Sequence, residues 1–253
     1  MSTNVIVGIA TIEARRKSIV ETIESLYLDA DQIHVYQNDF DEDYDFDAQS
    51  KILVYNSGFS YKNMGDIGKY APIIHGELSD PEIANSYIFT CDDDLIYNPN
   101  YILRMIASIE YHDRKAVVSY HGREYYGPVD SFYQSLMGKI EKGEAHNYRC
   151  MGAVHGKYDY PVTIVGTGCA AWHGSLFKDN PITIEDFPHP NMADIYFSKK
   201  CNDLGIPRFV VPHEEGEIRH SEHVDIREDT IAAKHFYDDA LQTEVFNSVK
   251  WSL

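Results

Sequence analysis

The stretch Tyr87-Ile88-Phe89-Thr90-Cys91-Asp92-Asp93-Asp94 joins an apolar run to three consecutive aspartates. The apolar part predicts a buried strand, and Asn98-Pro99 predicts the start of a helix soon after it. Carboxylates crowded at a strand end repel one another unless a cation compensates them, and hard divalent ions such as Mn²⁺ or Mg²⁺ prefer oxygen ligands. We therefore expect a metal site here, with an acidic turn that caps the next helix as the alternative.

Strand alternation divides the roles of the three aspartates. An extended backbone points Asp92 and Asp94 to one side and Asp93 to the other, which gives a D-x-D unit. We expect Asp94 to be the direct metal ligand. Asp92 would contact the ion, its bound water or a ribose, and Asp93 would have a structural place beside the donor.

The sequence around this stretch alternates strands and helices. Continuous apolar runs at 5–10, 33–36 and 52–55 predict further buried strands, and helical spacing over 16–28 predicts a helix between the first two. This pattern is typical of an α/β protein with a mostly parallel sheet, which binds ligands beyond the carboxyl ends of its strands. No internal repeat or flexible linker divides residues 1–253, so we expect one domain.

The second half of the chain continues the pattern less regularly. Residues 191–204 predict a helix that Gly205 ends, and a last helix is expected near 230–241. The segment 122–160 is rich in glycine, tyrosine and charge and shows little period. Further strands are expected at 116–120, 162–173 and 208–212.

Composition narrows the class of protein. Lys and Arg total 22 against 40 Asp and Glu, a formal net charge of −18, which disfavours broad binding to a nucleic-acid backbone. No apolar run approaches the roughly 18 residues that span a bilayer, and the N-terminus lacks the pattern of a secretory signal. We expect a cytoplasmic protein whose four widely spaced cysteines are buried thiols.

The order of motifs resembles that of the glycosyltransferase-A fold enzymes, family 2 most closely. The resemblance reaches from the first strand to about residue 213. It rests on a donor-site entrance, a D-x-D motif, a G-D-x-G-K segment of some bacterial members, an acceptor-side strand and a catalytic-base helix. These correspond here to Ala10-Thr11-Ile12-Glu13-Ala14-Arg15, Asp92–Tyr97, Gly65-Asp66-Ile67-Gly68-Lys69, Gly166-Thr167-Gly168 and Met192-Ala193-Asp194-Ile195.

The resemblance implies a nucleoside-diphosphate sugar donor, often a UDP-sugar. It divides the domain into a donor half, 1–97, and an acceptor half, 98–253. Simpler roles stay open for the donor-half residues, as a helix cap, a turn residue or a solvated lysine. The implied donor contacts are Thr11, Arg15 and Asn38 at the base and ribose, and Asp66 and Lys69 at the uracil or diphosphate.

The resemblance also implies a third metal ligand and a general base. His213 is our candidate ligand, because imidazole suits Mn²⁺ better than Mg²⁺, and His220 is the second choice. A zinc cluster of His213, His220 and His223 is the rival, although its spacing fits no common zinc motif. Asp194 would take the acceptor's proton and the reaction would invert the anomeric centre; otherwise Asp194 only stabilises a helix N-terminus.

Two other functions stay open on the sequence. A metal-dependent nucleotidyltransferase shares the fold logic but needs a basic glycine-rich N-terminal loop, which the Arg15-Arg16-Lys17 segment does not supply. A catalytically silent sugar-nucleotide or glycan-binding module is the third possibility. The sequence does not identify the acceptor. A glycan, a lipid-linked glycan, a protein and a modified nucleobase all stay open.

Overall fold

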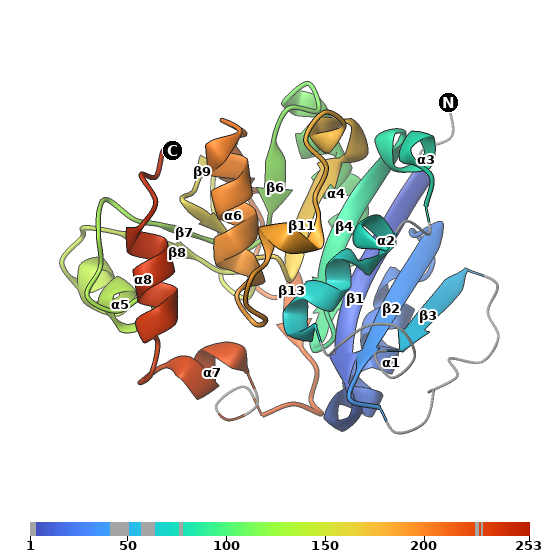
Figure 1. Cartoon of the computed structure of the whole chain (residues 1–253), viewed down its shortest axis with the longest axis horizontal. Helices are drawn as coiled ribbons and strands as arrows, with labels where there is room; N and C mark the ends of the chain where they lie inside the picture. Colours follow the sequence, from blue (N-terminus) through green and yellow to red (C-terminus); the bar gives the residue numbers. More distant parts are fainter. Residues whose placement is uncertain (1–3, 41–50, 57–63, 76–77, 226–227, 229) are drawn as a thin grey trace.

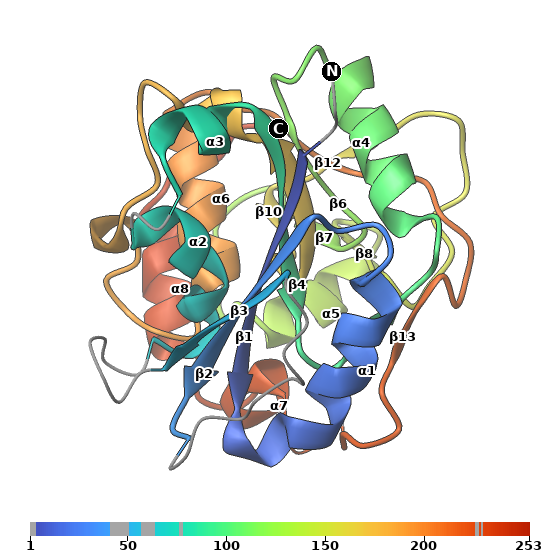
Figure 2. The ribbon, with the colours of Figure 1, turned by 90° about the vertical axis from the view of Figure 1, so that its right-hand side faces the viewer.

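A three-layer arrangement places helices on both faces of a central sheet. The computed structural model describes residues 4–40, 51–56, 64–75, 78–225, 228 and 230–253 of the chain. In these residues eight strands form the sheet, in the order β3-β2-β1-β4-β11-β6-β12-β9 (Figure 1). Figure 2 shows α1 and α4 on one face of the sheet and α2, α6 and α8 on the other. This confirms the predicted α/β class with a mixed, mostly parallel sheet.

The strands and helices of the described residues have the following bounds. The sheet strands are β1 (Asn4–Ile12), β2 (Gln32–Asn38), β3 (Ile52–Asn56), β4 (Ser86–Asp92), β6 (Val117–Ser119), β9 (Tyr160–Pro161), β11 (Cys169–His173) and β12 (Arg208–Val210). Two smaller sheets contain β7 (Gly122–Glu124), β8 (His146–Tyr148) and β10 (Ile164–Val165), and β5 (Leu95–Tyr97) with β13 (Ile218–His220). The α-helices are α1 (Arg16–Leu26), α2 (Ala71–Ile74), α3 (Asp80–Ala84), α4 (Tyr101–Tyr111), α5 (Gln134–Glu141), α6 (Ala193–Asp203), α7 (Ile231–His235) and α8 (Ala240–Asn247), and the 3₁₀ helices are η1 (Glu13–Arg15), η2 (Gly65–Tyr70), η3 (Gly174–Phe177) and η4 (Ile184–Asp186).

The parallel strands bring their carboxyl ends to one edge of the sheet. Strand β1 pairs in parallel with both β2 and β4, and Ala10 lies level with Tyr36 on one side and Asp92 on the other. These strands are buried on both faces because each face has its own core. One core packs β1 and β4 against α1 and α4, and the other packs them against η2, α6 and α8. The three aspartates therefore begin at the open edge of a rigid sheet.

A close backbone contact fixes η2 against this edge. A Cβ on Gly8 would lie 1.9 Å from the carbonyl oxygen of Lys69, so only glycine lets η2 approach β1 so closely. The contact positions η2, which carries Asp66 near its start and Lys69 near its end, over the end of the sheet. The glycine in the first strand thus determines the placement of a segment some sixty residues later.

Element boundaries differ from the sequence expectation at two helices. Helix α4 begins at Tyr101 because the side chain of Asn98 instead accepts a hydrogen bond from the backbone of Asn100, 2.8 Å away, and holds the turn before the helix. The expected last helix is two short helices, α7 and α8. The end of α6 is as predicted, with Gly205 at φ +67°. All four cysteines are buried and free, as predicted, and within the described residues no helix has both the length and the apolar character to cross a bilayer.

Candidate active site at the carboxyl edge of the sheet

A cavity of ≈ 380 Å³ opens at the carboxyl ends of the parallel strands. Residues from β1, β2, η2, the turn after β4 and the start of α6 line it, so segments nearly two hundred residues apart meet around one space. The structure brings every predicted site residue to this cavity except the two candidate histidines, His213 and His220. Those that line it are Thr11, Arg15, Asn38, Asp66, Lys69, Asp92, Asp93, Asp94 and Asp194.

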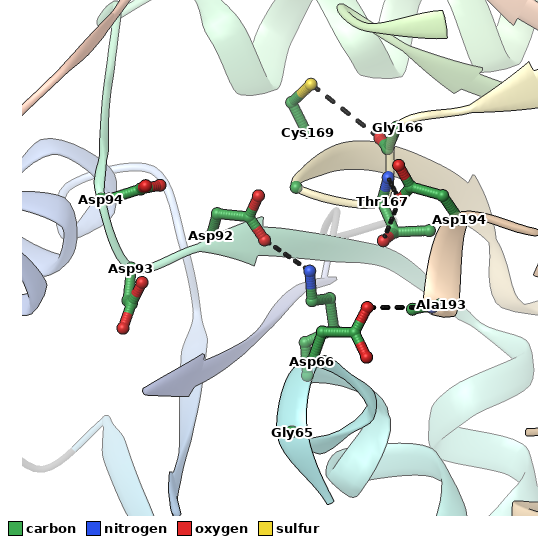
Figure 3. Close-up of polar contacts among 12 residues, drawn as sticks. Gly65, Asp66, Asp92, Asp93, Asp94, Gly166, Thr167, Cys169, Ala193 and Asp194 are labelled. Atoms are coloured by element: carbon green, nitrogen blue, oxygen red, sulfur yellow. Dashed lines mark hydrogen bonds and ion pairs between the residues drawn. The ribbon is translucent and has the colours of Figure 1, made fainter. Parts of the chain in front are cut away.

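The three aspartates do not follow strand alternation. Strand β4 ends at Asp92, and Asp93 and Asp94 form the turn into β5. One guanidinium nitrogen of Arg15 therefore reaches both, at 2.9 Å from Asp94 Oδ2 and 3.6 Å from Asp93 Oδ1. The expectation that Asp93 points away from the other two is wrong because the extended backbone stops one residue too early. All three side chains line the cavity (Figure 3).

Two cations of the protein partly compensate the three carboxylates. Arg15 pairs with Asp93 and Asp94, and Lys69 forms an ion pair with Asp92. Burial lowers the pKa of Lys69, but the carboxylates of Asp92 and Asp66 outweigh it and hold this pKa above its usual value. Burial, with a contribution from Asp94, raises the pKa of Asp93 against the opposing effect of Arg15. The crowding of negative charge that the sequence predicts is therefore present, and it is only partly relieved.

The donor set for a metal ion is incomplete in the present side-chain arrangement. Within the described residues no three His, Cys, Asp or Glu side chains surround a common point. The best fit is Asp94 with His220, whose Nδ1 lies 4.0 Å from Asp94 Oδ2. This nitrogen is buried and has no hydrogen-bond partner among those residues. Ligands of an ion with bonds of about 2.1 Å lie roughly 3 to 4.2 Å apart, so the two side chains fit one ion with small adjustments.

His213 lies elsewhere. Its Nδ1 is 2.7 Å from the carbonyl oxygen of Val211 and its Nε2 is 3.1 Å from that of Arg149. The buried ring stacks on Tyr120, with 4.5 Å between ring centroids. The pairing of β13 with β5 instead sets His220 opposite Leu95, directly after the aspartates. The structure thus places our second choice, and not our first, beside Asp94.

Asn38 uses its side chain to join three backbone segments. Its Nδ2 donates to the carbonyl oxygens of Thr11 and Gly65, at 3.3 and 3.0 Å. Its Oδ1 accepts from the backbone N–H of Met64 and Gly65, at 2.9 and 3.1 Å. Although Asn38 lines the cavity, these four bonds favour the simpler role that the sequence left open, which is to shape the turn.

Asp194 and Asp66 meet at the N-terminus of α6. Asp194 Oδ1 accepts hydrogen bonds from the backbone N–H and the hydroxyl of Thr167, at 2.8 and 2.7 Å (Figure 3). Asp66 Oδ2 accepts from the backbone N–H of Ala193 at 2.9 Å, and burial raises the pKa of Asp66 to about 6. The first contact fixes the orientation of one carboxylate at the cavity wall. The second ties η2 to α6, so the two sides of the cavity are held together.

The backbone at Gly168 touches the carboxylate of Asp92. A Cβ on Gly168 would lie 1.9 Å from Asp92 Oδ2. The carbonyl oxygen of Gly168 accepts from the hydroxyl of Tyr97, at 2.5 Å, and from the backbone N–H of Asp92, at 3.1 Å. The predicted Gly166-Thr167-Gly168 segment therefore supports Asp92 and Asp194 from one short turn.

One wall of the cavity contains residues that the sequence does not predict as part of the site. These residues come from β7, the segment before α5, and α7, and the weak periodicity of 122–160 gave no signal for them. Arg123, between the glycine and glutamate of a short strand, was the one basic residue that could have been noticed. The missed lining residues are His121, Arg123, Phe132, Tyr133, Thr230, Ile231, Ala232, Lys234 and His235.

Comparisons with known proteins give a match in structure only. No protein-family model matches the chain, and neither does any curated protein sequence. Among solved structures the chain is similar to GalNAc-T7, whose crystal structure contains UDP, GalNAc and Mn²⁺. The TM-score is 0.54 at 12% sequence identity, and the match covers 87% of this chain and 44% of that one.

The likeness shows the fold. It confirms the predicted glycosyltransferase-A class, and the resemblance to family 2 in particular stays a prediction. The chain spans less than half the length of the matched structure. What GalNAc-T7 binds therefore bears on this protein only through the residues of the cavity.

Proposed function

We propose that this protein is a metal-dependent, inverting glycosyltransferase of the family 2 kind that transfers a sugar from a nucleoside-diphosphate donor, UDP in the first instance, to an acceptor hydroxyl. One observation carries the proposal. In a fold shared with a glycosyltransferase, a single cavity joins the aspartates after β4 to two buried cations and to an oriented carboxylate at the start of α6. The donor half, 1–97, supplies the aspartates and the two cations, and the acceptor half, 98–253, supplies the carboxylate of Asp194.

The donor would lie across the carboxyl ends of β1 and β4. Thr11 and Arg15, which line the cavity, would contact the base and ribose, and Lys69, which pairs with Asp92, would contact the diphosphate. Asp94 and His220 would hold the metal ion, and Asp92 would contact the ribose or water bound to the ion. His220 replaces His213 because it lies beside Asp94, whereas His213 does not. When bound, Mn²⁺ or Mg²⁺ neutralises the charge that develops on the departing diphosphate.

Asp194 is suited to the role of general base. Thr167 holds Oδ1 with two hydrogen bonds, which leaves Oδ2 of the same carboxylate for a proton from the acceptor. Removal of this proton by a carboxylate across from the departing diphosphate corresponds to direct displacement and inversion. Asp66 supports this geometry because it holds the first backbone N–H of α6.

The test is a thermal-shift screen of nucleoside diphosphates and their sugars, with and without Mn²⁺, followed by analysis of the anomeric product. A matching donor should raise the unfolding midpoint in a metal-dependent way, because it binds only the folded state. Asp194→Asn should keep this shift and lose transfer, while Asp203→Asn, an exposed change on the same helix, should keep both. No metal-dependent shift with any donor would exclude the proposal, and donor binding without sugar release by the wild type would indicate a silent binding module.

A further inference from the structure

The missed wall of the cavity carries positive charge in an acidic protein. We name it the β7–α7 wall and define it by Arg123, Phe132, Tyr133, Lys234 and His235, all of which line the cavity. The chain as a whole has a net charge of −18. Cations gathered at one wall of a cavity therefore require a local explanation.

Arg123 is held in place by aromatic rings. Its guanidinium carbon lies 5.1 Å from the ring centroid of Phe132 and 5.4 Å from that of Tyr133. Cation–π contacts of this kind hold the guanidinium in place, and one of its N–H groups also donates to the side chain of Tyr125. Arg123 thus presents a rigid fork of donors at the cavity wall.

The charge of Arg123 differs from that of the donor-side cations in one respect. Arg15 and Lys69 have carboxylate partners within ion-pair distance, whereas no described carboxylate forms an ion pair with Arg123 or Lys234. Arg123 is attracted to Asp194, which lies beyond ion-pair distance. A partly buried guanidinium with no carboxylate in direct contact is costly, and its planar set of donors is suited to bind an anion.

The carboxylate of Asp239, near the same wall, is committed to other contacts. Asp239 Oδ2 accepts from the hydroxyl of Ser131 and the backbone N–H of Tyr133, each at 2.7 Å. Its Oδ1 accepts from the hydroxyl of Thr243 at 3.2 Å. Asp239 therefore holds the segment that carries the aromatic rings, and it leaves the charge of Arg123 for a ligand.

We propose that the β7–α7 wall binds an anionic group of the acceptor, a phosphate or a carboxylate, through Arg123 with Lys234 as a second cation. The inference rests on the proposed glycosyltransferase function and specifies its acceptor. Arg123 shares the cavity with Asp194 and stands on the sheet of β7, β8 and β10, apart from the strands that carry the donor-side aspartates. A planar fork of N–H groups matches the paired oxygens of phosphate or carboxylate, and the acceptor hydroxyl would then face Asp194.

The first experiment measures binding of inorganic phosphate and of acetate by calorimetry, in protein saturated with UDP and Mg²⁺. The wild type should bind at least one of the two anions, and Arg123→Gln should weaken that affinity on the order of 10- to 100-fold, the range for hydrogen bonds to a charged group. Arg123→Lys should give an intermediate loss. Arg114→Gln removes the same charge from an exposed ion pair with Glu110, beyond the end of α4, and should change nothing.

The second experiment compares matched acceptors that differ only in charge: a methyl glucoside, its 6-phosphate, the corresponding glucuronide and a phosphodiester. UDP release should be fastest with an anionic member, and the fastest one tells a phosphate site from a carboxylate site. Lys234→Gln, on the exposed side of α7, should reduce this preference several-fold and carries little risk to folding should Arg123→Gln fail to fold.

Three results would overturn the inference: no anion binding by the UDP-loaded wild type, equal binding by wild type and Lys234→Gln, or no preference among the acceptors. Loss of anion binding when UDP is added would assign Arg123 to the donor and refute an acceptor role. Failure of the glycosyltransferase proposal itself is distinct, because the wild type would then show no metal-dependent shift with UDP or with any nucleotide sugar.

Discussion

Gly168→Ala tests whether the turn after β10 supports the aspartates. The new Cβ would lie 1.9 Å from Asp92 Oδ2 and 2.4 Å from its Cγ, whereas ordinary contacts begin near 3.4 Å. The backbone of Gly168 cannot easily retreat, because its carbonyl oxygen accepts from Tyr97 and from the N–H of Asp92. The carboxylate must therefore move by more than about 1 Å, and it separates from Lys69.

The expected cost follows from these two effects. Overpacking of a well-packed site costs about 1–3 kcal/mol, and Lys69, only 4% exposed, also loses its carboxylate partner. We expect the free energy of unfolding to fall by about 3 kcal/mol, at the upper end of that range. For a chain of this size the thermal midpoint should fall by roughly 2–4 °C per kcal/mol.

The measurement is urea unfolding of Gly168→Ala beside the thermal shift that UDP and Mn²⁺ produce. Gly138→Ala is the matched control, because Gly138 lies in α5 with no heavy atom within 4 Å of the added Cβ. It should stabilise the protein by about 0.5–1 kcal/mol and leave the metal-dependent shift intact. The reasoning would be refuted if Gly168→Ala were as stable as the wild type and showed the same metal-dependent shift. Displacement of the Asp92 carboxylate would then have no cost.

Three further predictions concern single side chains of the site. Asp194→Asn should lower turnover by about 10²- to 10⁴-fold with donor affinity retained, as steady-state kinetics and thermal shifts would reveal; equal turnover would exclude the base. His220→Ala should weaken the Mn²⁺-dependent shift, whereas His213→Ala should lower stability and leave that shift alone; the reverse result would restore His213 as the ligand. Because the pKa of Asp66 is raised to about 6 in the folded protein, folding stabilises its protonated form. The free energy of unfolding of the wild type, relative to that of Asp66→Asn, should therefore fall by on the order of 2–3 kcal/mol as the pH rises from about 4 to about 6, and then level off. Urea unfolding between pH 4 and 8 measures this, and parallel curves for the two proteins would contradict it.

The sequence predicts the donor side of the site because parallel strands have a fixed geometry. Continuous apolar runs identify β1 and β4, and strands of this type end at a common edge. Residues that directly follow such runs, Arg15 and Asp92 among them, must then be neighbours whatever the details of packing. The cavity contains both.

Register and turn geometry explain what the sequence could not supply. The choice between His213 and His220 depends on which segment pairs with β5: β13 sets His220 opposite Leu95, whereas His213 pairs with Val154. The direction of the Asp93 side chain depends on whether β4 ends at Asp92 or continues. The apolar pattern does not determine where the strand ends. Helix α7 reaches the cavity only through tertiary packing, since five residues are too few to show a period.

The two cations of the site already pair with the aspartates that would bind a metal ion. Three adjacent carboxylates suggest a metal ion on charge alone, yet Arg15 already contacts Asp94 and Lys69 already contacts Asp92. On the proposed function, Asp94 would hold the ion in place of its contact with Arg15, and the guanidinium would then need another anionic partner. The diphosphate brings the negative charge that both Arg15 and the ion need. Metal and nucleotide should therefore bind together, because each supplies the partner that the other displaces.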